Sequence, residues 1–399
     1  MENNNNLTPL LRFPGFTGEW EEKKLGDITK NEDSKRRPIA KVNRETGTYP
    51  YYGANGVQDY IGDYIFDGDY LLVGEDGSVL TAENTPVINW ASGKFWVNNH
   101  AHVLSQKEGT SLLYVSFVLS TIKIQGFVTG IPPKLNQENL NNIAVPIPSK
   151  LLEQEKVAHF LFEMDKLISI QNQKVDALKE KKKGLMQQLF PQPGETAPRL
   201  RFPEFEGDWT ETTLGEMADK VNKRNSQLEV SRVFTNSATS GIIDQSDYFD
   251  RDIAVIDNTS NYHIVETGDF VYNPRISAAA PVGPISMNNL GRGIMSPLYM
   301  VFRFHSGDNS FFEQYYQTTI WHPYLKSIAN YGARFDRMNI TTEGFFNMPL
   351  LVPSPSEQQK IASCLSEMDT LIVSESSKLE GLKSHKRGLM QQLFPQTAK

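Results

Sequence analysis

The sequence predicts an α+β protein made of two similar halves, each a mostly β globular domain followed by one long helix. Two observations support this prediction. Short boxes recur in the same order: residues 11–20 (LRFPGFTGEW) return as 200–209 (LRFPEFEGDW), and GLMQQLFPQ occurs at both 184–192 and 388–396. Between the boxes, each half has short apolar stretches broken by turn residues, then a long helical pattern. Similar frames around dissimilar contents indicate one architecture used twice.

The composition is that of an ordinary globular protein, and it limits the possible functions. Of 399 residues, 39% are hydrophobic and 22% are charged, so two or three domains are expected. No apolar run approaches the length of a membrane-spanning helix, the N-terminus lacks a signal-peptide pattern, and Cys364 is the only cysteine. We therefore expect a cytoplasmic protein with no membrane contact and no internal disulfide. The net charge of −7 counts against a simple, strongly basic nucleic-acid binder.

The pattern along the chain predicts five segments. They are a first globular domain, a first long helix, a linker, a second globular domain and a second long helix, at residues 1–150, 151–190, 191–199, 200–355 and 356–396. In the globular domains, turn signals such as Gly53-Ala54-Asn55-Gly56 separate stretches rich in β-branched and aromatic residues, which favours short strands. One helix is expected inside each domain, at 111–125 and 311–320. The linker holds three prolines and one glycine.

Both long helices carry a coiled-coil seam, with apolar residues at alternating steps of four and three. The seam residues are Val157, Leu161, Met164, Ile168, Val175, Leu178, Leu185 and Leu189 in the first helix, and Ile361, Leu365, Met368, Ile372, Leu379, Leu382, Leu389 and Leu393 in the second. Seams of this length favour packing of the two helices on each other. The alternative is that each seam covers only its own domain.

Polar residues within the seams predict the direction of this pairing. A parallel pair in register would place Lys182 against Lys386, which is unfavourable for like charges. An antiparallel pair instead places Lys386 near Glu163 and Asp165. It also places Lys182 near Glu367 and Asp369. We therefore predict an antiparallel coiled coil that relates the two halves by a pseudo-two-fold axis.

Several further segments, in a fixed order, are typical of one protein family. They include YYGANG at 51–56, GEDG at 74–77, NNHAH at 98–102, and the stretches PSKLLEQE and PSPSEQQ that precede the long helices at 148–155 and 353–359. Together with the repeated tryptophan boxes, this ordered set resembles the specificity subunit of type I restriction–modification systems. The resemblance extends over nearly the whole chain.

The resemblance implies a non-enzymatic subunit that binds double-stranded DNA. Each globular domain would be a target-recognition domain that reads one half of a bipartite, asymmetric sequence. The paired helices would set the gap between the half-sites and dock two modification (methyltransferase) subunits, and restriction (translocase and nuclease) subunits would join them. No cofactor is expected in this chain, because S-adenosylmethionine, ATP and Mg²⁺ would belong to the partner subunits. Phosphate contacts shared with partners would also accommodate the acidic net charge.

Candidate DNA contacts are cations and amide or hydroxyl groups in turns and at expected strand ends, because such groups bind phosphates and base edges. In the first domain they are Lys35, Arg36, Arg37, Asn55, Asn98, Asn99, His100 and Lys134. In the second domain they are Arg224, Asn273, Arg275, Ser277, Arg292, Arg334 and Arg337. Each also has a plainer interpretation as a solvated surface residue or a turn residue. The repeated Trp20 and Trp209 are expected in the shared core or in a docking surface.

The sequence lacks the motifs of catalysis. Residues 273–276 (NPRI) only partly resemble the box of adenine methyltransferases, and neither a P-loop nor a nucleophile elbow is present. No Cys or carboxylate set accompanies His100 and His102 in the sequence, so no metal site is expected. Two other functions stay open: a coiled-coil scaffold that binds only proteins, and a stand-alone methyltransferase. Steep salt dependence of DNA binding would distinguish DNA reading from the scaffold.

Overall fold

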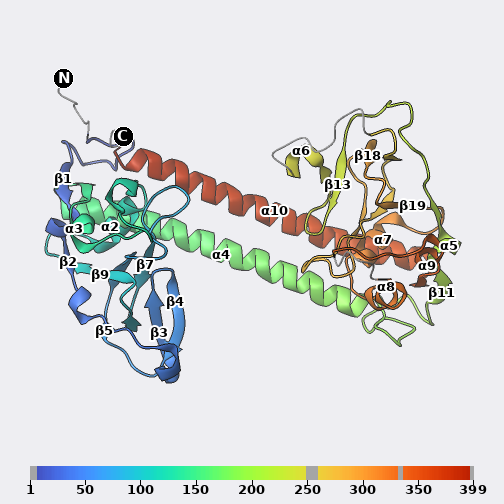
Figure 1. Ribbon diagram of the computed structural model, residues 1–399, viewed down its shortest axis with the longest axis horizontal. Helices are drawn as coiled ribbons and strands as arrows, with labels where there is room; N and C mark the ends of the chain where they lie inside the picture. Colours follow the sequence, from blue (N-terminus) through green and yellow to red (C-terminus); the bar gives the residue numbers. More distant parts are fainter. Residues whose placement is uncertain (1–6, 249–258, 331–335, 396–399) are drawn as a thin grey trace. The chain divides into compact units, whose positions relative to one another are not determined.

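The computed structural model describes residues 7–248, 259–330 and 336–395. It has the α+β architecture that the repeats predict (Figure 1). The chain divides into two compact units, Met1–Gln173 with Ser376–Lys399, and Lys174–Glu375. Each unit therefore contains one globular domain, part of the helix that follows it, and part of the other long helix. Across the described residues, no helix combines the length and apolar character needed to cross a membrane.

Two four-stranded sheets form the body of the first globular domain. One has the order β2-β9-β6-β7, with strands Thr29–Asn31, Ala101–Gln106, Tyr70–Gly74 and Ile88–Ala91. The other has the order β4-β3-β8-β5, with strands Gly56–Ile61, Thr46–Gly53, Lys94–Val97 and Phe66–Asp67. A separate antiparallel pair joins β1 (Glu21–Lys24) to β10 (Ala144–Ile147). The short helices are α1 (Leu25–Ile28), α2 (Leu112–Leu119) and α3 (Gln137–Asn141).

The second globular domain repeats part of this arrangement. Its four-stranded sheet has the equivalent order β12-β19-β16-β17, with strands Ala218–Lys220, Met300–Phe304, Phe270–Tyr272 and Ile285–Met287. The pair β11 (Thr210–Thr213) and β20 (Pro349–Val352) corresponds to β1 and β10. Its short helices are α5 (Leu214–Met217), α6 (Gln245–Tyr248), α7 (Asn309–Tyr316), α8 (His322–Ile328) and α9 (Thr342–Phe346).

The remaining strands of the second domain form two pairs where the first domain has one sheet. Strand β13 (Phe234–Ser237) pairs with β14 (Gly241–Asp244), and β15 (His263–Val265) pairs with β18 (Gly293–Met295). An isolated parallel bridge between Val233 and Ile294 joins the two pairs in the order β14-β13-β18-β15. This order corresponds to β4-β3-β8-β5 of the first domain, so the strand order is part of the frame that the two repeats share.

The helix predicted at 111–125 is shorter than its sequence suggests. The structure ends α2 at Leu119, where the hydroxyl groups of Ser120 and Thr121 donate to backbone carbonyls of the last turn at 2.6 and 2.7 Å. The backbone N–H of Ile124 donates to the carbonyl of Asn84 instead of continuing the helix. Side-chain capping and a contact distant in sequence therefore override the apolar helical pattern.

One long helix follows each globular domain. Helix α4 spans Leu151–Leu189 and α10 spans Pro355–Leu393. Both end just before a Phe-Pro pair, because proline disfavours helical geometry at the residue before it. Every predicted seam residue is buried or half-buried. Two off-seam apolar residues of α4 are exposed by contrast, Leu167 at 52% and Ile170 at 63%.

In the second unit, ion pairs show that the two helical segments run antiparallel. Lys182 Nζ lies 2.7 Å from Oδ1 of Asp369, one of the two acidic neighbours that the sequence predicts. Lys174 Nζ lies 3.0 Å from Glu375 Oε2. Asp369 precedes Glu375 in α10, whereas its partner Lys182 follows Lys174 in α4. The two segments therefore run in opposite directions.

The first unit contains the equivalent arrangement. Lys386 Nζ lies 2.6 Å from Oδ1 of Asp165, again one of the two predicted acidic neighbours. Further along α10, Leu393 belongs to the same apolar cluster as Val157, which precedes Asp165 in α4. The two segments are therefore antiparallel here as well, and they lie side by side within the unit (Figure 1).

Candidate nucleic-acid interface

The repeated boxes hold the start of each long helix to its globular domain. The Arg12 guanidinium donates to both carboxylate oxygens of Glu153, at 2.6 and 2.8 Å, and Trp20 Nε1 donates to the same carboxylate at 3.2 Å. Arg201 and Glu357 repeat this pair at 2.8 Å for both bonds. We call each set the Arg–Glu clamp. The Arg–Glu clamp is not among the features predicted from the sequence. Its sequence signal is that the arginine and the glutamate both recur at equivalent positions in the two repeats.

In each globular domain, the segment after one strand pairs with the loop that precedes a short helix. After β6, the carbonyl of Glu75 accepts from the Leu135 N–H at 2.8 Å, and Asp76 lies opposite Lys134 in an isolated bridge. After β16, Arg275 lies opposite Arg337 in the corresponding bridge. We call these places the first junction (Glu75, Asp76, Lys134 and Leu135) and the second junction (Pro274, Arg275, Asp336 and Arg337). Several predicted DNA contacts lie at or beside them.

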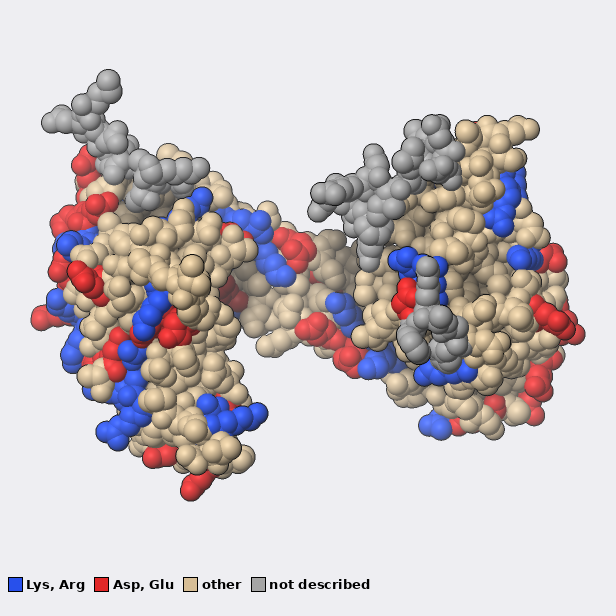
Figure 2. Space-filling view, viewed as in Figure 1, with Lys and Arg blue, Asp and Glu red and all other residues tan. Residues whose placement is uncertain are grey.

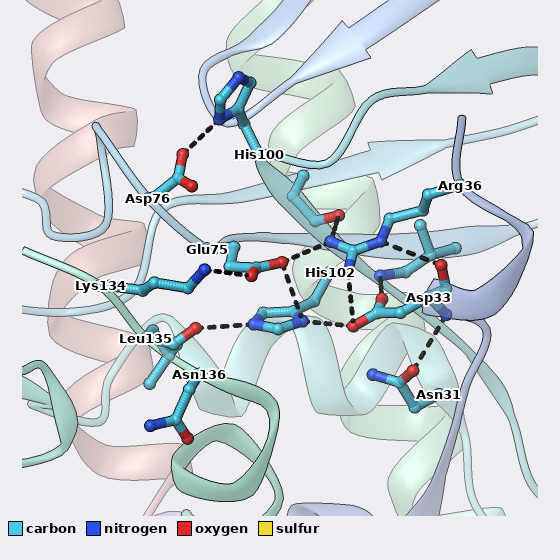
Figure 3. Close-up of polar contacts among 12 residues, drawn as sticks. Asn31, Asp33, Arg36, Glu75, Asp76, His100, His102, Lys134, Leu135 and Asn136 are labelled. Carbon is cyan, nitrogen blue, oxygen red and sulfur yellow. Dashed lines mark hydrogen bonds and ion pairs between the residues drawn. The ribbon is translucent and has the colours of Figure 1, made fainter. Parts of the chain in front are cut away.

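At the first junction, cations and carboxylates form one connected network (Figure 3). Glu75 accepts from Arg36 Nη1 at 2.5 Å, and its other oxygen lies 3.0 Å from Lys134 Nζ. Arg36 Nη2 lies 3.3 Å from Asp33 Oδ2, and this oxygen also lies 2.6 Å from His102 Nδ1. The Arg36 side chain is only 14% exposed. The predicted contact Arg36 is therefore held inside the domain, whereas Lys134 reaches the surface with half of its side chain exposed.

His102 is buried within this network, at 1% exposure. Its Nε2 lies 2.8 Å from the carbonyl oxygen of Leu135, and its Nδ1 lies 2.6 Å from Asp33 Oδ2. Burial alone would raise the pKa of Asp33, but the hydrogen bond and charge of His102, with the amide of Val103, lower it below its ordinary value.

The fold brings together a set of groups that sequence analysis did not expect around His102. Ligand atoms of Asp33, Glu75 and His102 lie within 4.8 Å of one another, a spacing that suits a metal ion. However, Arg36 and Lys134 already neutralise Glu75. Burial alone would raise the pKa of Glu75, but its hydrogen bonds with these two cations outweigh burial and lower the pKa. A divalent cation would have to displace these cations, so we assign the set to the ion-pair network.

The remaining candidates of the first domain differ in exposure. His100 bonds through Nδ1 to Asp76 and keeps 48% of its side chain exposed. Asn98 is buried at 3%, and its Oδ1 accepts from the His100 backbone N–H at 2.8 Å, so it shapes the turn and does not reach the surface. The Asn55 amide donates to the Ser78 hydroxyl at 2.7 Å. The exposed candidates here are Lys35, Arg37, Asn55, Asn99, His100 and Lys134.

At the second junction, two arginines lie side by side. Arg275 is exposed, and the Arg337 side chain is 23% exposed with its Nε 3.7 Å from Asp336. Asn273, a predicted contact, is only 7% exposed because its Nδ2 donates to the carbonyl of Asn236 at 2.9 Å. Its Oδ1 accepts from the Arg275 N–H at 3.1 Å. Asn273 therefore builds the turn that presents Arg275.

The other candidates of the second domain have local partners. Arg224 donates to the carbonyl of Asn261 at 2.6 Å, and Arg292 lies 2.6 Å from Glu229. Ser277 is exposed, and its hydroxyl accepts from a nearby backbone amide at 3.1 Å. Arg334 lies outside the described residues. Figure 2 shows that acidic and basic side chains are interspersed on the visible face of both units.

Comparisons with known proteins agree with this architecture. Residues 17–180 match the family model of the type I restriction modification DNA specificity domain. A putative type I restriction enzyme specificity subunit from Haemophilus influenzae is 36% identical over 158 residues, which cover 39% of this chain but only 40% of that protein. The type I restriction enzyme MjaVIII specificity subunit from Methanocaldococcus jannaschii is 24% identical over 410 residues, covering 96% of this chain and 93% of that protein.

A solved structure shares the fold. The crystal structure of the type I restriction–modification S subunit from M. genitalium matches 98% of this chain and 100% of that chain, with a TM-score of 0.65 and 13% sequence identity. The family model, the relatives and this fold agree with the ordered motifs and the repeated frame. The chain therefore carries a type I restriction modification DNA specificity domain at residues 17–180, and it is similar in sequence and fold to type I specificity subunits.

Proposed function

We propose that this chain is the non-catalytic, DNA-reading subunit of a type I restriction–modification complex. The observation that carries the proposal is a common frame with different reading surfaces. Both domains share a sheet order and the Arg–Glu clamp, but one junction pairs an acid with a lysine and the other pairs two arginines. Because sequence is read by side chains at base edges and position by contacts to phosphates, two different surfaces would read two different half-sites.

The helices and boxes support the proposed partners. Leu167 and Leu371 occupy equivalent positions in the two repeats and are 52% and 41% exposed, outside the seam in each case. An exposed apolar residue at the same place in each half supports two modification subunits, one for each half. Restriction subunits would complete the complex, and S-adenosylmethionine, ATP and Mg²⁺ would be bound by these partners.

The scaffold alternative explains less of the molecule. It accounts for the helix pair but gives no reason for two arginines opposite each other in one domain and an Asp–Lys pair at the equivalent place in the other. A stand-alone methyltransferase would need the cofactor and catalytic motifs that the sequence lacks.

Selection from a random duplex DNA library tests the proposal. The full chain assembled with its modification subunit should enrich a two-part motif with a fixed gap, and binding should weaken steeply as salt rises. The modification subunit alone is the control and should enrich no such motif. A one-part motif, or no enrichment by a stable complex, would contradict the proposed function.

A further inference from the structure

We propose that Arg275 and Arg337 form a clamp for a single DNA backbone phosphate in the half-site read by the second domain. This inference rests on the proposed DNA reading and adds to it the way in which the two domains differ. The first junction neutralises its own charges, whereas the second junction depends on an anion from the DNA. We call Arg275 and Arg337 the phosphate clamp.

The backbone places the two arginines directly opposite each other. The Ile276 N–H donates to the carbonyl of Asp336 at 3.0 Å, and the Met338 N–H donates to the carbonyl of Pro274, also at 3.0 Å. These bonds flank the bridge between Arg275 and Arg337, which makes it a non-hydrogen-bonded antiparallel pair.

In such a pair the Cβ atoms are about 4.5–5.5 Å apart, so the two side chains leave the backbone as close neighbours. Like charges directly opposite each other in this way are destabilising.

Little within the described chain offsets this repulsion. No carboxylate of the described residues lies within ion-pair distance of Arg275. Arg337 Nε is 3.7 Å from the carboxylate of Asp336, whose side chain is 60% exposed. That Nε is itself buried and has no hydrogen-bond partner among the described residues. Two guanidinium groups in this state are a ready-made site for an external anion.

The first junction shows the contrasting solution at the equivalent place. There the bridge joins Asp76 to Lys134, and the Lys134 ammonium lies 3.0 Å from Glu75. Each cation of that network has a carboxylate partner, so it requires no external anion. The same backbone arrangement therefore carries a balanced network in one domain and an unbalanced pair in the other.

The chemistry favours a phosphate over a base edge as the ligand of the clamp. A guanine edge accepts hydrogen bonds but is uncharged, so it would not offset the repulsion between two guanidinium groups. A backbone phosphate carries a full negative charge and two free oxygens, and each oxygen can accept from one planar guanidinium. One phosphate can thus satisfy both arginines.

The test compares the salt dependence of DNA binding among variants of the full chain, assembled with its modification subunit. The double variant Arg275→Gln with Arg337→Gln removes both charges and keeps side chains of similar length. Arg232→Gln is the matched control, because Arg232 is an exposed arginine of the same domain that pairs with Asp244 and is not among the candidate DNA contacts. Near-ultraviolet circular dichroism checks that each variant is folded, and Arg275→Met with Arg337→Met replaces the glutamine pair if that pair is not.

One phosphate contact contributes about 0.9 to the slope of log affinity against log salt. The double variant should therefore have a slope that is shallower by about 0.9, and the control should keep the original slope. Over a fourfold rise in salt, the original chain should lose roughly three- to fourfold more affinity than the double variant. A decrease of about 1.8 would show two separate phosphates and overturn the shared clamp, and an unchanged slope would overturn any phosphate contact.

A second readout separates phosphate from base contacts. A phosphate contact weakens binding to all sequences alike, so the double variant should select the same motif from a random library. Loss of preference at one position of the second half-site would assign the arginines to a base edge and overturn the proposal. If the unaltered complex shows no sequence-dependent binding, the proposed function itself fails and this inference fails with it. If that complex binds specifically and the variants match it, only the clamp fails.

Discussion

Lys182 and Asp369 form an ion pair of 2.7 Å between the two long helices, and Lys386 and Asp165 form its counterpart at 2.6 Å. In each pair, one repeat supplies the lysine and the other repeat supplies the aspartate. The charges that interrupt the apolar seams are therefore satisfied only when the helices pair antiparallel. This relationship expresses the internal repeat of the sequence as a reciprocal contact between its halves.

The first prediction concerns the unequal burial of these lysines. Lys182 has 8% of its side chain exposed and Lys386 has 19%, and Lys182 also donates to Gln317. Removing the partner of a buried ammonium leaves a charge without compensation. We expect Asp369→Ala to lower the free energy of unfolding by about 2–3 kcal/mol, and Asp165→Ala by about half as much. Urea denaturation measures both, and a larger cost for Asp165→Ala would refute this reading of the helix pair.

The second prediction concerns the Arg–Glu clamp. Glu153 is 1% exposed, so Glu153→Ala leaves the guanidinium of Arg12 without its buried carboxylate. This change should cost about 3 kcal/mol of folding free energy. Glu155→Ala, an exposed position in the same turn of α4, should change stability by less than about 0.5 kcal/mol. Similar costs for the two variants, measured by chemical denaturation, would show that the clamp is not a structural support.

The third prediction is a pH dependence of the second unit. Burial, followed by the positive charges of Arg224 and Lys220, lowers the pKa of His263 from 6.5 to about 4. Between these values the unfolded chain binds a proton that the folded chain does not, so folding stability is highest above pH 6.5 and falls as the pH drops toward 4. His263→Gln should flatten this part of the stability curve. Unchanged curvature in the variant would mean that other groups cause the acid sensitivity.

The fourth prediction concerns modular reading. Replacing residues 30–148 with the corresponding segment of a relative should change only one half of the DNA target. The clamp residues Arg12, Trp20 and Glu153 lie outside this segment, so the attachment of the domain to α4 is retained. Sequencing of selected DNA or of methylated sites would identify the new motif. A change in both halves would contradict one-domain, one-half-site reading.

The features that the sequence predicts well are those encoded by local periodicity. Residue spacing and charge along single helices indicate the seam, the ends of α4 and α10, and the acidic neighbours of Lys182 and Lys386. The interface is less predictable, because its contacts join segments far apart in the sequence. Arg36 was expected at the surface, but the pairing of β2 with β9 and of β9 with β6 brings it to Glu75.

Burial also changes the meaning of several candidates. Asn98 and Asn273 both follow apolar strands and have the side chains expected of base-reading residues, yet each is buried and hydrogen-bonded to the backbone of its own turn. Composition at a strand end does not distinguish a side chain that builds a turn from one that projects from it. The opposed positions of Arg275 and Arg337 likewise depend on a bridge between two loops, which no local pattern predicts.

The central claim is that this chain directs DNA modification by reading a bipartite sequence. Its most direct test is methylation mapping of the genome of a host that expresses the modification subunit, with and without this chain. The account predicts a two-part methylated motif, with a fixed gap, that appears only when the chain is present. No new motif, despite a stable complex of the chain with the modification subunit, would contradict DNA reading and favour the protein-binding scaffold.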